Sequence, residues 1–101
     1  MAEQSAKKEV TVTNEMGLHV RPSSCFVEIA SQFEADIFVK READRVDGKS
    51  LMSILSLGAK KGTLLSIEAN GPDAQGAVSA LADLIENGLW DENGLTNRAT
   101  N

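Results

Sequence analysis

The spacing of apolar residues limits the possible folds of this chain more than any other feature, because it alternates between the period of a strand and that of a helix. Four stretches show the alternation or short apolar run of a strand, and three show the spacing of an amphipathic helix. This order is typical of an α+β two-layer sandwich, in which helices cover one face of an antiparallel sheet. The predicted strands are 10–13, 36–40, 45–47 and 64–69, and the predicted helices run from Pro22 to about Phe33, over 51–57, and from Gly71-Pro72-Asp73 to a stop at Gly88.

Length and composition fit one small globular domain. The net charge of −5 argues against nucleic acid, which proteins bind largely through Lys and Arg. One histidine and one cysteine argue against a zinc site, and Cys25, among the apolar positions of the first helix, is expected to be a buried, inert thiol. The chain has no segment with the apolar length of a membrane span or a signal peptide. We therefore expect a cytoplasmic protein that does not insert into the membrane.

The only histidine, His19, lies where the first predicted strand gives way to the first predicted helix. Gly17 precedes it in a flexible turn, and Pro22 follows it, a residue tolerated only in the first turn of a helix. His19 is therefore expected at or just before a helix N-terminus, where unpaired N–H groups and partial positive charge favour an anion. Arg21 can add a planar fork of donors. We interpret His19 as a nucleophile that carries a phosphoryl group; an incidental surface or capping histidine is the alternative.

Two separate stretches point to a known family. Residues 17–22 are Gly-Leu-His-Val-Arg-Pro, and residues 47–58 are Asp-Gly-Lys-Ser followed by an apolar run and a glycine. They resemble, at the expected separation, the active-site segment and the regulatory-serine helix of the HPr family, the histidine-containing phosphocarriers of the bacterial sugar phosphotransferase system. The similarity runs from about Glu9 to Asn87. Val20, where the family usually has Ala or Thr, and Met16, where some members carry a polar residue near the imidazole, depart from the pattern.

This resemblance implies a four-stranded open-faced sandwich that acts as a phosphoryl carrier. It implies that His19 takes phosphate on Nδ1 from the phosphohistidine of enzyme I and passes it to the A domain of a sugar-specific enzyme II. Arg21 and the backbone amides that open the first helix, those of Val20 and Arg21, would hold the phosphate. Catalysis is then shared with the partner proteins. No metal or organic cofactor is indicated, and a monomer is expected.

Ser50 stands directly before the short helix 51–57 and is predicted to cap its N-terminus, which alone would explain a hydroxyl there. The resemblance also implies that a dedicated kinase and phosphorylase modify Ser50 in some bacteria, and that the phosphorylated form acts with a transcriptional regulator. A phosphate there would add about two negative charges without refolding the chain. Lys49 is expected to take part in partner docking with the helix that follows, where it would contact the kinase, or else to be solvated. A basic patch is predicted from His19, Arg21, Lys49, Lys60 and Lys61.

The helix 51–57 carries more apolar residues than one buried face can hold. Ile54 and Leu57 are predicted to face the core. Leu51, Met52 and Leu55 are predicted to form an exposed docking patch near His19, because Met and Leu side chains repack readily against different partners. A loop or the C-terminal tail covering these residues is the alternative.

One domain is predicted over residues 9–88, between a flexible extension, 1–8, and a C-terminal tail, 89–101, pinned where Leu89 and Trp90 meet the body. Three other functions stay open from the sequence. They are a carrier of the nitrogen-related regulatory branch, an interaction module whose active form carries phosphate on Ser50, and a small phosphohydrolase that uses His19 covalently. The last of these lacks an obvious second acid or base in the sequence near the histidine.

Overall fold

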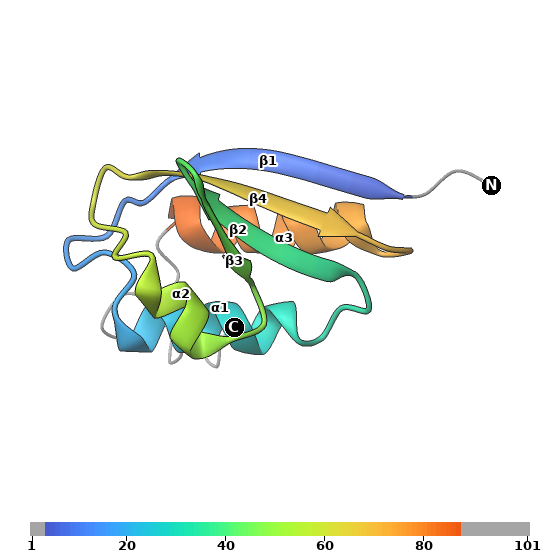
Figure 1. Ribbon diagram of the computed structural model, residues 1–101, viewed down its shortest axis with the longest axis horizontal. Helices are drawn as coiled ribbons and strands as arrows, with labels where there is room; N and C mark the ends of the chain where they lie inside the picture. The colour runs from blue at the N-terminus through green and yellow to red at the C-terminus, as the bar shows by residue number, and fades with distance from the viewer. Residues whose placement is uncertain (1–3, 88–101) are drawn as a thin grey trace.

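The computed structural model of the protein describes residues 4–87, and the predicted elements occur there in the predicted order (Figure 1). Apart from the first strand, their bounds lie close to those expected from the apolar pattern. The strands are β1 (Ser5–Thr11), β2 (Asp36–Arg41), β3 (Asp44–Asp47) and β4 (Leu64–Asn70), and the helices are α1 (Val20–Ala30), α2 (Leu51–Ser56) and α3 (Ala74–Asn87).

The strands form one antiparallel sheet in the order β1-β4-β2-β3. β4 comes late in the sequence but lies between the first two strands, so β1 and β3 are the edges. Pairs from Ser5↔Asn70 to Thr11↔Leu64 join β1 to β4 along its whole length. Because successive side chains of a strand point to opposite faces, these pairs define an inner and an outer face of the sheet.

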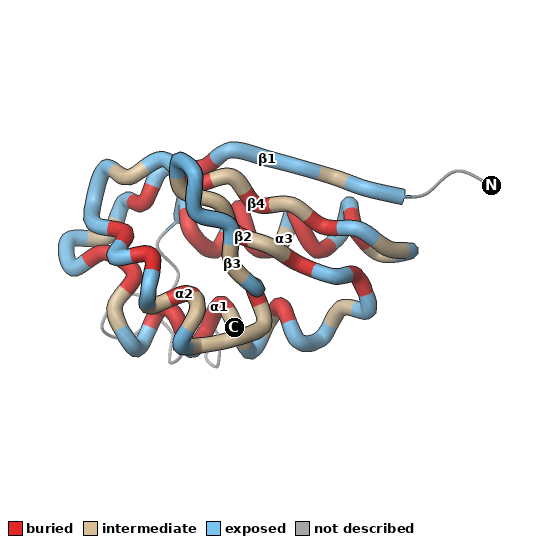
Figure 2. Tube along the Cα trace, viewed as in Figure 1, coloured by how far each residue is buried: buried red, intermediate tan, exposed pale blue. Residues whose placement is uncertain are grey.

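All three helices pack on the inner face, and the core lies between the two layers (Figures 1 and 2). Alternate residues of the central strands, such as Ile37, Val39 and Ile67, are buried there. They join one continuous cluster with the helices, which confirms the predicted open-faced α+β sandwich. The predicted apolar stripe of α3 is buried in full: Ala74, Ala77, Val78, Leu81, Leu84 and Ile85.

The first strand begins at Ser5, and the predicted start at residue 10 was wrong. Residues 5–8 are polar or small, so they carry no apolar signal, yet their backbones pair with β4. β1 is an edge strand with mostly exposed side chains, among which only Val10 is fully buried (Figure 2). Strand pairing, which is not local in sequence, holds this segment in the sheet instead of leaving it as a flexible extension. The predicted tail 89–101 lies outside the described residues.

Candidate functional site: the start of the first helix

A tightly bonded loop leads from β1 to His19. The side-chain amide of Asn14 donates to the Gly17 carbonyl at 2.7 Å, and the Gly17 amide donates to the Asn14 carbonyl at 3.1 Å. Gly17 has φ +72°, and a Cβ built on it would collide with the carbonyl oxygen of Ala59 and lie 2.8 Å from Cα of Lys60. Only glycine satisfies both the backbone angle and the space, so this loop packs directly on the segment after α2.

The backbone around His19 is fixed from both sides. The Leu18 amide donates to the Ala59 carbonyl at 2.8 Å, and the buried hydroxyl of Ser23 donates to the Leu18 carbonyl at 3.1 Å. The Ser23 amide makes the first helical hydrogen bond, to the carbonyl of His19, at 3.0 Å. His19 is therefore the N-cap residue of α1, as predicted, with extended backbone angles of φ −85° and ψ −167°.

The imidazole of His19 does not cap the helix it precedes. Its side chain makes no capping hydrogen bond, and the residue is half-buried. Pro22 has no N–H, and the Ser23 N–H is already bonded inside the helix, so the Val20 amide is the first donor that the helix presents at this end. No acidic residue occupies the first turn. The ring therefore sits at a helix end whose partial positive charge has no counter-charge within that turn.

The two residues that are predicted to hold the phosphate, Val20 and Arg21, come directly after His19. Val20 is the first residue of α1 and is 59% exposed, and Arg21 is exposed on the same turn. Met16, at one of the positions that departs from the family pattern, is 67% exposed on the loop before the histidine. Apolar side chains thus stand on either side of His19 along the chain.

The short helix α2 packs beside α1 (Figure 1). Ile54 and Leu57 are buried, as predicted. Met52 is 73% exposed, whereas Leu51 and Leu55 are half-buried. Of the three residues predicted to form an exposed docking patch, Met52 is therefore the exposed one, and the two leucines are partly packed into the body.

Ser50 is the N-cap of α2, as predicted, because its hydroxyl accepts a hydrogen bond from the Ser53 amide at 3.3 Å. The residue is half-buried. A residue that sequence reasoning missed fixes the other end of this helix: the guanidinium of Arg41 donates to the carbonyl of Leu57 at 2.7 Å. A helix of six residues is held at both ends by side chains, and its C-terminal end leads into the Ala59 segment that supports the histidine loop.

The predicted basic patch is divided between the two ends of α1. The ammonium group of Lys49 donates to the carbonyl of Phe33 at 2.7 Å, beyond the C-terminal end of α1. Since α1 has 11 residues, that end lies roughly 16 Å from His19 along the helix axis. The grouping of Lys49 with the histidine was therefore wrong. The cause is the direction of α2, whose N-terminus faces the far end of α1.

Lys60 and Lys61 do lie beside the histidine loop. Lys60 follows the carbonyl that receives the Leu18 amide, and Lys61 forms a 2.7 Å ion pair with Glu15 of the loop itself. The hydrogen bond from Lys61, and then its charge, lower the pKa of Glu15 below its ordinary value. This exposed ion pair is a second link between the loop and the segment after α2.

Within residues 4–87, no group of three or more histidine, cysteine, aspartate or glutamate side chains is placed so that it could hold a metal ion. No helix in the same part of the chain has both the length and the apolar character needed to cross a bilayer. The site therefore consists of one imidazole, one helix end and the surfaces beside it.

Comparisons with known proteins agree with this arrangement. A family model described as "PTS HPr component phosphorylation site" matches residues 6–87. The chain is 42% identical over 86 residues to phosphocarrier protein HPr of Neisseria meningitidis, covering 85% of this chain and 96% of that one.

Solved structures give the same result. A phosphocarrier protein HPr from Bacillus anthracis has a TM-score of 0.78 and 38% identity, over 81% of this chain and 98% of that one. Crh, a Bacillus subtilis catabolite repression protein solved as a domain-swapped dimer, has a TM-score of 0.66 and 35% identity, over 77% and 90% of the two chains. The chain therefore belongs to the HPr family, the phosphocarriers of the phosphotransferase system.

Proposed function

We propose that this protein accepts a phosphoryl group on Nδ1 of His19 from the phosphohistidine of enzyme I and donates it to the A domain of a sugar-specific enzyme II. The observation that carries the proposal is the imidazole of His19 at the N-cap of α1, half-buried and without a capping hydrogen bond. Since the ring makes no capping hydrogen bond to α1, it is available to a partner that approaches this end of the helix. A helix N-terminus beside it suits an anion.

Each transfer exchanges one N–P bond for another. The lone pair of His19 Nδ1 forms the new bond to phosphorus while the bond to the donor imidazole breaks, and the donor nitrogen keeps that electron pair. The second transfer repeats this with His19 as the leaving group. Since nitrogen replaces nitrogen, the protein needs only to position the phosphoryl group and to stabilise its oxygens.

The Val20 and Arg21 amides and the Arg21 guanidinium are the groups proposed to hold those oxygens. A helix end contributes about 0.3 to 2 kcal/mol to an adjacent charge, which is enough to adjust a transfer equilibrium and too little to drive one. The guanidinium group of Arg21 would then stay in contact with the phosphoryl oxygens as negative charge spreads over them. This is a positioning role shared with whichever partner is docked.

Partner docking is proposed for the surface of Leu51, Met52 and Leu55 on α2, and for Val20 beside the histidine. Met52 and Val20 are 73% and 59% exposed, so both side chains are available to a partner. Enzyme I and the A domain of enzyme II must each reach the same nitrogen, so the surface must accept two shapes. Flexible methionine suits that requirement.

Regulation is proposed at Ser50. A phosphate on its hydroxyl would lie at the N-terminus of α2, where negative charge stabilises a helix, and would place about two charges next to the apolar docking surface. Binding of enzyme I would weaken while the fold stayed intact. A kinase and phosphorylase acting on Ser50, and a transcriptional regulator that binds the phosphorylated form, would complete this branch; the likeness to Crh supports it.

The direct test is incubation with phosphoenolpyruvate and enzyme I, followed by phosphorus NMR and mass spectrometry. An acid-labile phosphate on Nδ1 of His19 is expected, and its transfer to an enzyme IIA domain should follow. The His19→Ala protein should stay unlabelled. Label on another residue, or none on the wild-type chain, would overturn the proposal.

The same assay separates the sugar branch from the nitrogen-related branch, according to which enzyme I and enzyme IIA homologues exchange phosphate fastest with this chain. A cytoplasmic location is proposed for this exchange. A monomer is proposed as the active form, to be measured by light scattering.

A further inference from the structure

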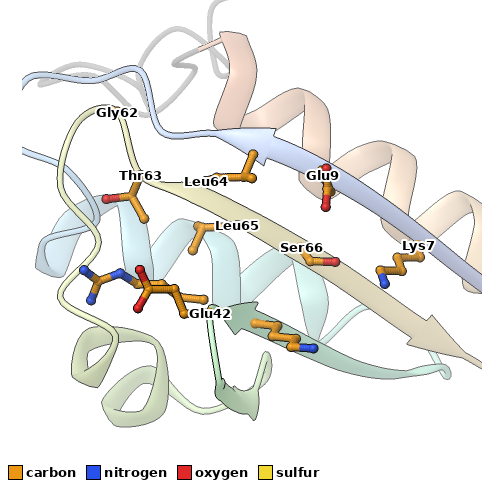
Figure 3. Close-up of a pocket in the computed structure, with 10 residues that line it drawn as sticks. Lys7, Glu9, Glu42, Gly62, Thr63, Leu64, Leu65 and Ser66 are labelled. Carbon is orange, nitrogen blue, oxygen red and sulfur yellow. The ribbon is translucent and has the colours of Figure 1, made fainter.

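A hollow of about 560 Å³ lies on the outer face of the sheet, which the helices do not cover (Figure 3). Its walls come from β1, β4, the end of β2 and the turn before β4. The volume falls within the range of about 300 to 1,000 Å³ that is usual for small-molecule sites. The site is distinct from His19, which lies at the start of α1, and none of its walls belongs to the phosphoryl-transfer surface.

Five charged side chains line this hollow. The guanidinium of Arg41 donates to the carbonyl of Leu57, and the other four, two lysines and two glutamates, do not pair with one another in the described part of the chain. Lys7 and Glu9 project from β1, and Glu42 comes from the turn that follows β2 (Figure 3). Lys40 belongs to β2. Throughout residues 4–87, no ion pair involves any of these four side chains. Lys7, Glu9 and Glu42 are exposed and Lys40 is half-buried, so each can reach a bound molecule, and a molecule that carries both charges would complement this mixed lining.

Ser66 on β4 lies between these charges. In the sheet register it is opposite Glu9 on one side and Lys40 on the other. Its hydroxyl oxygen is buried and has no hydrogen-bond partner within the described chain. A buried hydroxyl without a partner is uncommon and destabilising, so a ligand that supplied the missing hydrogen bond would remove that cost.

Glu42 is held in an unfavourable backbone conformation at the rim. The pairing of Arg41 with Asp44 leaves Glu42 and Ala43 as a two-residue turn, and Glu42 has φ +54°. It is the one non-glycine residue with positive φ within residues 4–87. A two-residue hairpin turn favours positive φ, and glycine would meet this requirement without strain. The glutamate at this position instead places a carboxylate at the rim of the hollow.

We propose that the hollow binds a small zwitterion, a free amino acid or a short peptide. Its carboxylate would contact the ammonium groups of Lys7 and Lys40, and its ammonium group would contact the carboxylates of Glu9 and Glu42. The hydroxyl of Ser66 would hydrogen-bond to the ligand between the two charged ends. Leu64, 55% exposed, supplies an apolar wall beside them.

The test is an amide chemical-shift titration of the full chain with glycine, glycylglycine and triglycine, which carry both charges at increasing separation and have no side chains. Acetate and methylammonium, the two halves of a zwitterion, are the matched reference ligands. Saturable shifts are expected at residues 62–66 and at Glu42. At least one zwitterion should bind about tenfold more tightly than either half, as expected when a second charge-assisted contact is added. Absence of saturation, or equal binding by acetate, would overturn the proposal.

Two variants assign the binding to the hollow. Lys7→Met should weaken binding about tenfold, because it removes one charge-assisted contact. Lys8→Met changes the neighbouring exposed lysine of the same strand, which does not line the hollow, and should leave the affinity unchanged. Equal affinities of the two proteins would contradict the assignment.

Glu42→Gly separates binding from stability. It should raise the melting temperature, because glycine accepts the positive φ, and should weaken binding about tenfold through loss of the carboxylate. A Glu42→Gly protein that binds the zwitterion as well as the wild type would overturn the role given to Glu42.

Discussion

The N-cap residues of α1 and α2 differ in what their side chains do. At α2, the hydroxyl of Ser50 accepts the Ser53 amide at 3.3 Å, so the side chain stabilises its own helix. At α1, His19 occupies the N-cap with extended backbone angles, but its ring makes no capping bond. The first helix is held instead by its neighbours, through the Ser23 hydroxyl and the Leu18 amide.

This difference shows how a small fold keeps one side chain available for chemistry. Removing a capping interaction weakens a helix, so a cap that does not bond must be supported elsewhere. Here the loop residue Gly17 and the segment after α2 supply that support. The stability of the site and its reactivity therefore reside in different residues, and mutations should separate them.

The largest effect is expected from His19→Ser. Phosphorylation at this position should be abolished, since the nucleophilic nitrogen is gone. Stability should rise by about 1 kcal/mol, because serine is a preferred N-cap residue and can accept an amide that His19 leaves without a capping bond. Urea denaturation and the phosphoenolpyruvate-dependent labelling assay measure the two effects.

His19→Ala is the matched control, because it removes the ring without adding a cap. It should be equally inactive in the labelling assay and close to the wild type in stability. A loss of stability in His19→Ala comparable to a lost cap would show that the ring supports the helix after all.

Gly17→Ala should be the most destabilising change, costing about 3 kcal/mol, because it combines a strained positive φ with a collision. The methyl group would meet the backbone of Ala59 and Lys60. Gly58→Ala is the matched control, since Gly58 has a similar φ of +58° with nothing within 4 Å of the added carbon. It should cost only about 1 kcal/mol, the strain alone. Equal costs in urea denaturation would mean that the loop does not depend on the Ala59 contact.

Ser50→Ala tests the other helix start and should have a smaller effect. Loss of the capping bond should cost about 1 kcal/mol while the rate of His19 phosphorylation stays close to that of the wild type. Ser50→Asp keeps an acceptor at the N-cap and adds a negative charge beside the docking surface. It should retain stability but slow transfer from enzyme I. Equal transfer rates for the two variants would argue against regulation by charge at this position.

The position of His19 could be predicted because its signals are local. Gly17 and Pro22 bracket the end of a turn and the first turn of a helix, and the structure places His19 at the N-cap between them. The same holds for Ser50, where a hydroxyl precedes an apolar helix, and for Ile54 and Leu57, which were predicted to face the core. Patterns within a few residues were enough for each of these.

What could not be predicted depends on contacts between distant segments. Residues 5–8 have no apolar alternation, and only pairing with β4 makes them a strand. Lys49 is a sequence neighbour of Ser50, but the direction in which α2 crosses α1 carries it to Phe33, away from His19. The cap that Arg41 gives to Leu57 spans 16 residues. The sequence pattern specifies the elements, whereas their mutual orientation decides which charges meet.

Asp73, at the start of α3, uses its side chain in a third way, different from His19 and Ser50. Its substitution is expected to have the smallest effect. Its carbonyl accepts the Ala77 amide, while its carboxylate accepts the Glu34 and Ala35 amides at 2.9 Å each, tying α3 to the loop after α1. The Glu34 hydrogen bond, followed by that from Ala35, holds the pKa of Asp73 below its ordinary value of 3.8. The folded state therefore binds this proton less tightly than the unfolded chain does.

The stabilising contribution of Asp73 is complete above its unfolded pKa and is lost as the pH falls through its lower, folded pKa. Asp73→Asn should therefore melt below the wild type at neutral pH, and the two melting temperatures should converge as the pH is lowered below about 4. Asp83→Asn, at an exposed position on α3 whose side chain makes no hydrogen bond within residues 4–87, should stay close to the wild type throughout. A constant gap between Asp73→Asn and the wild type, from neutral pH to pH values below both pKa values, would show that the loop is held by shape and not by the charge of the carboxylate.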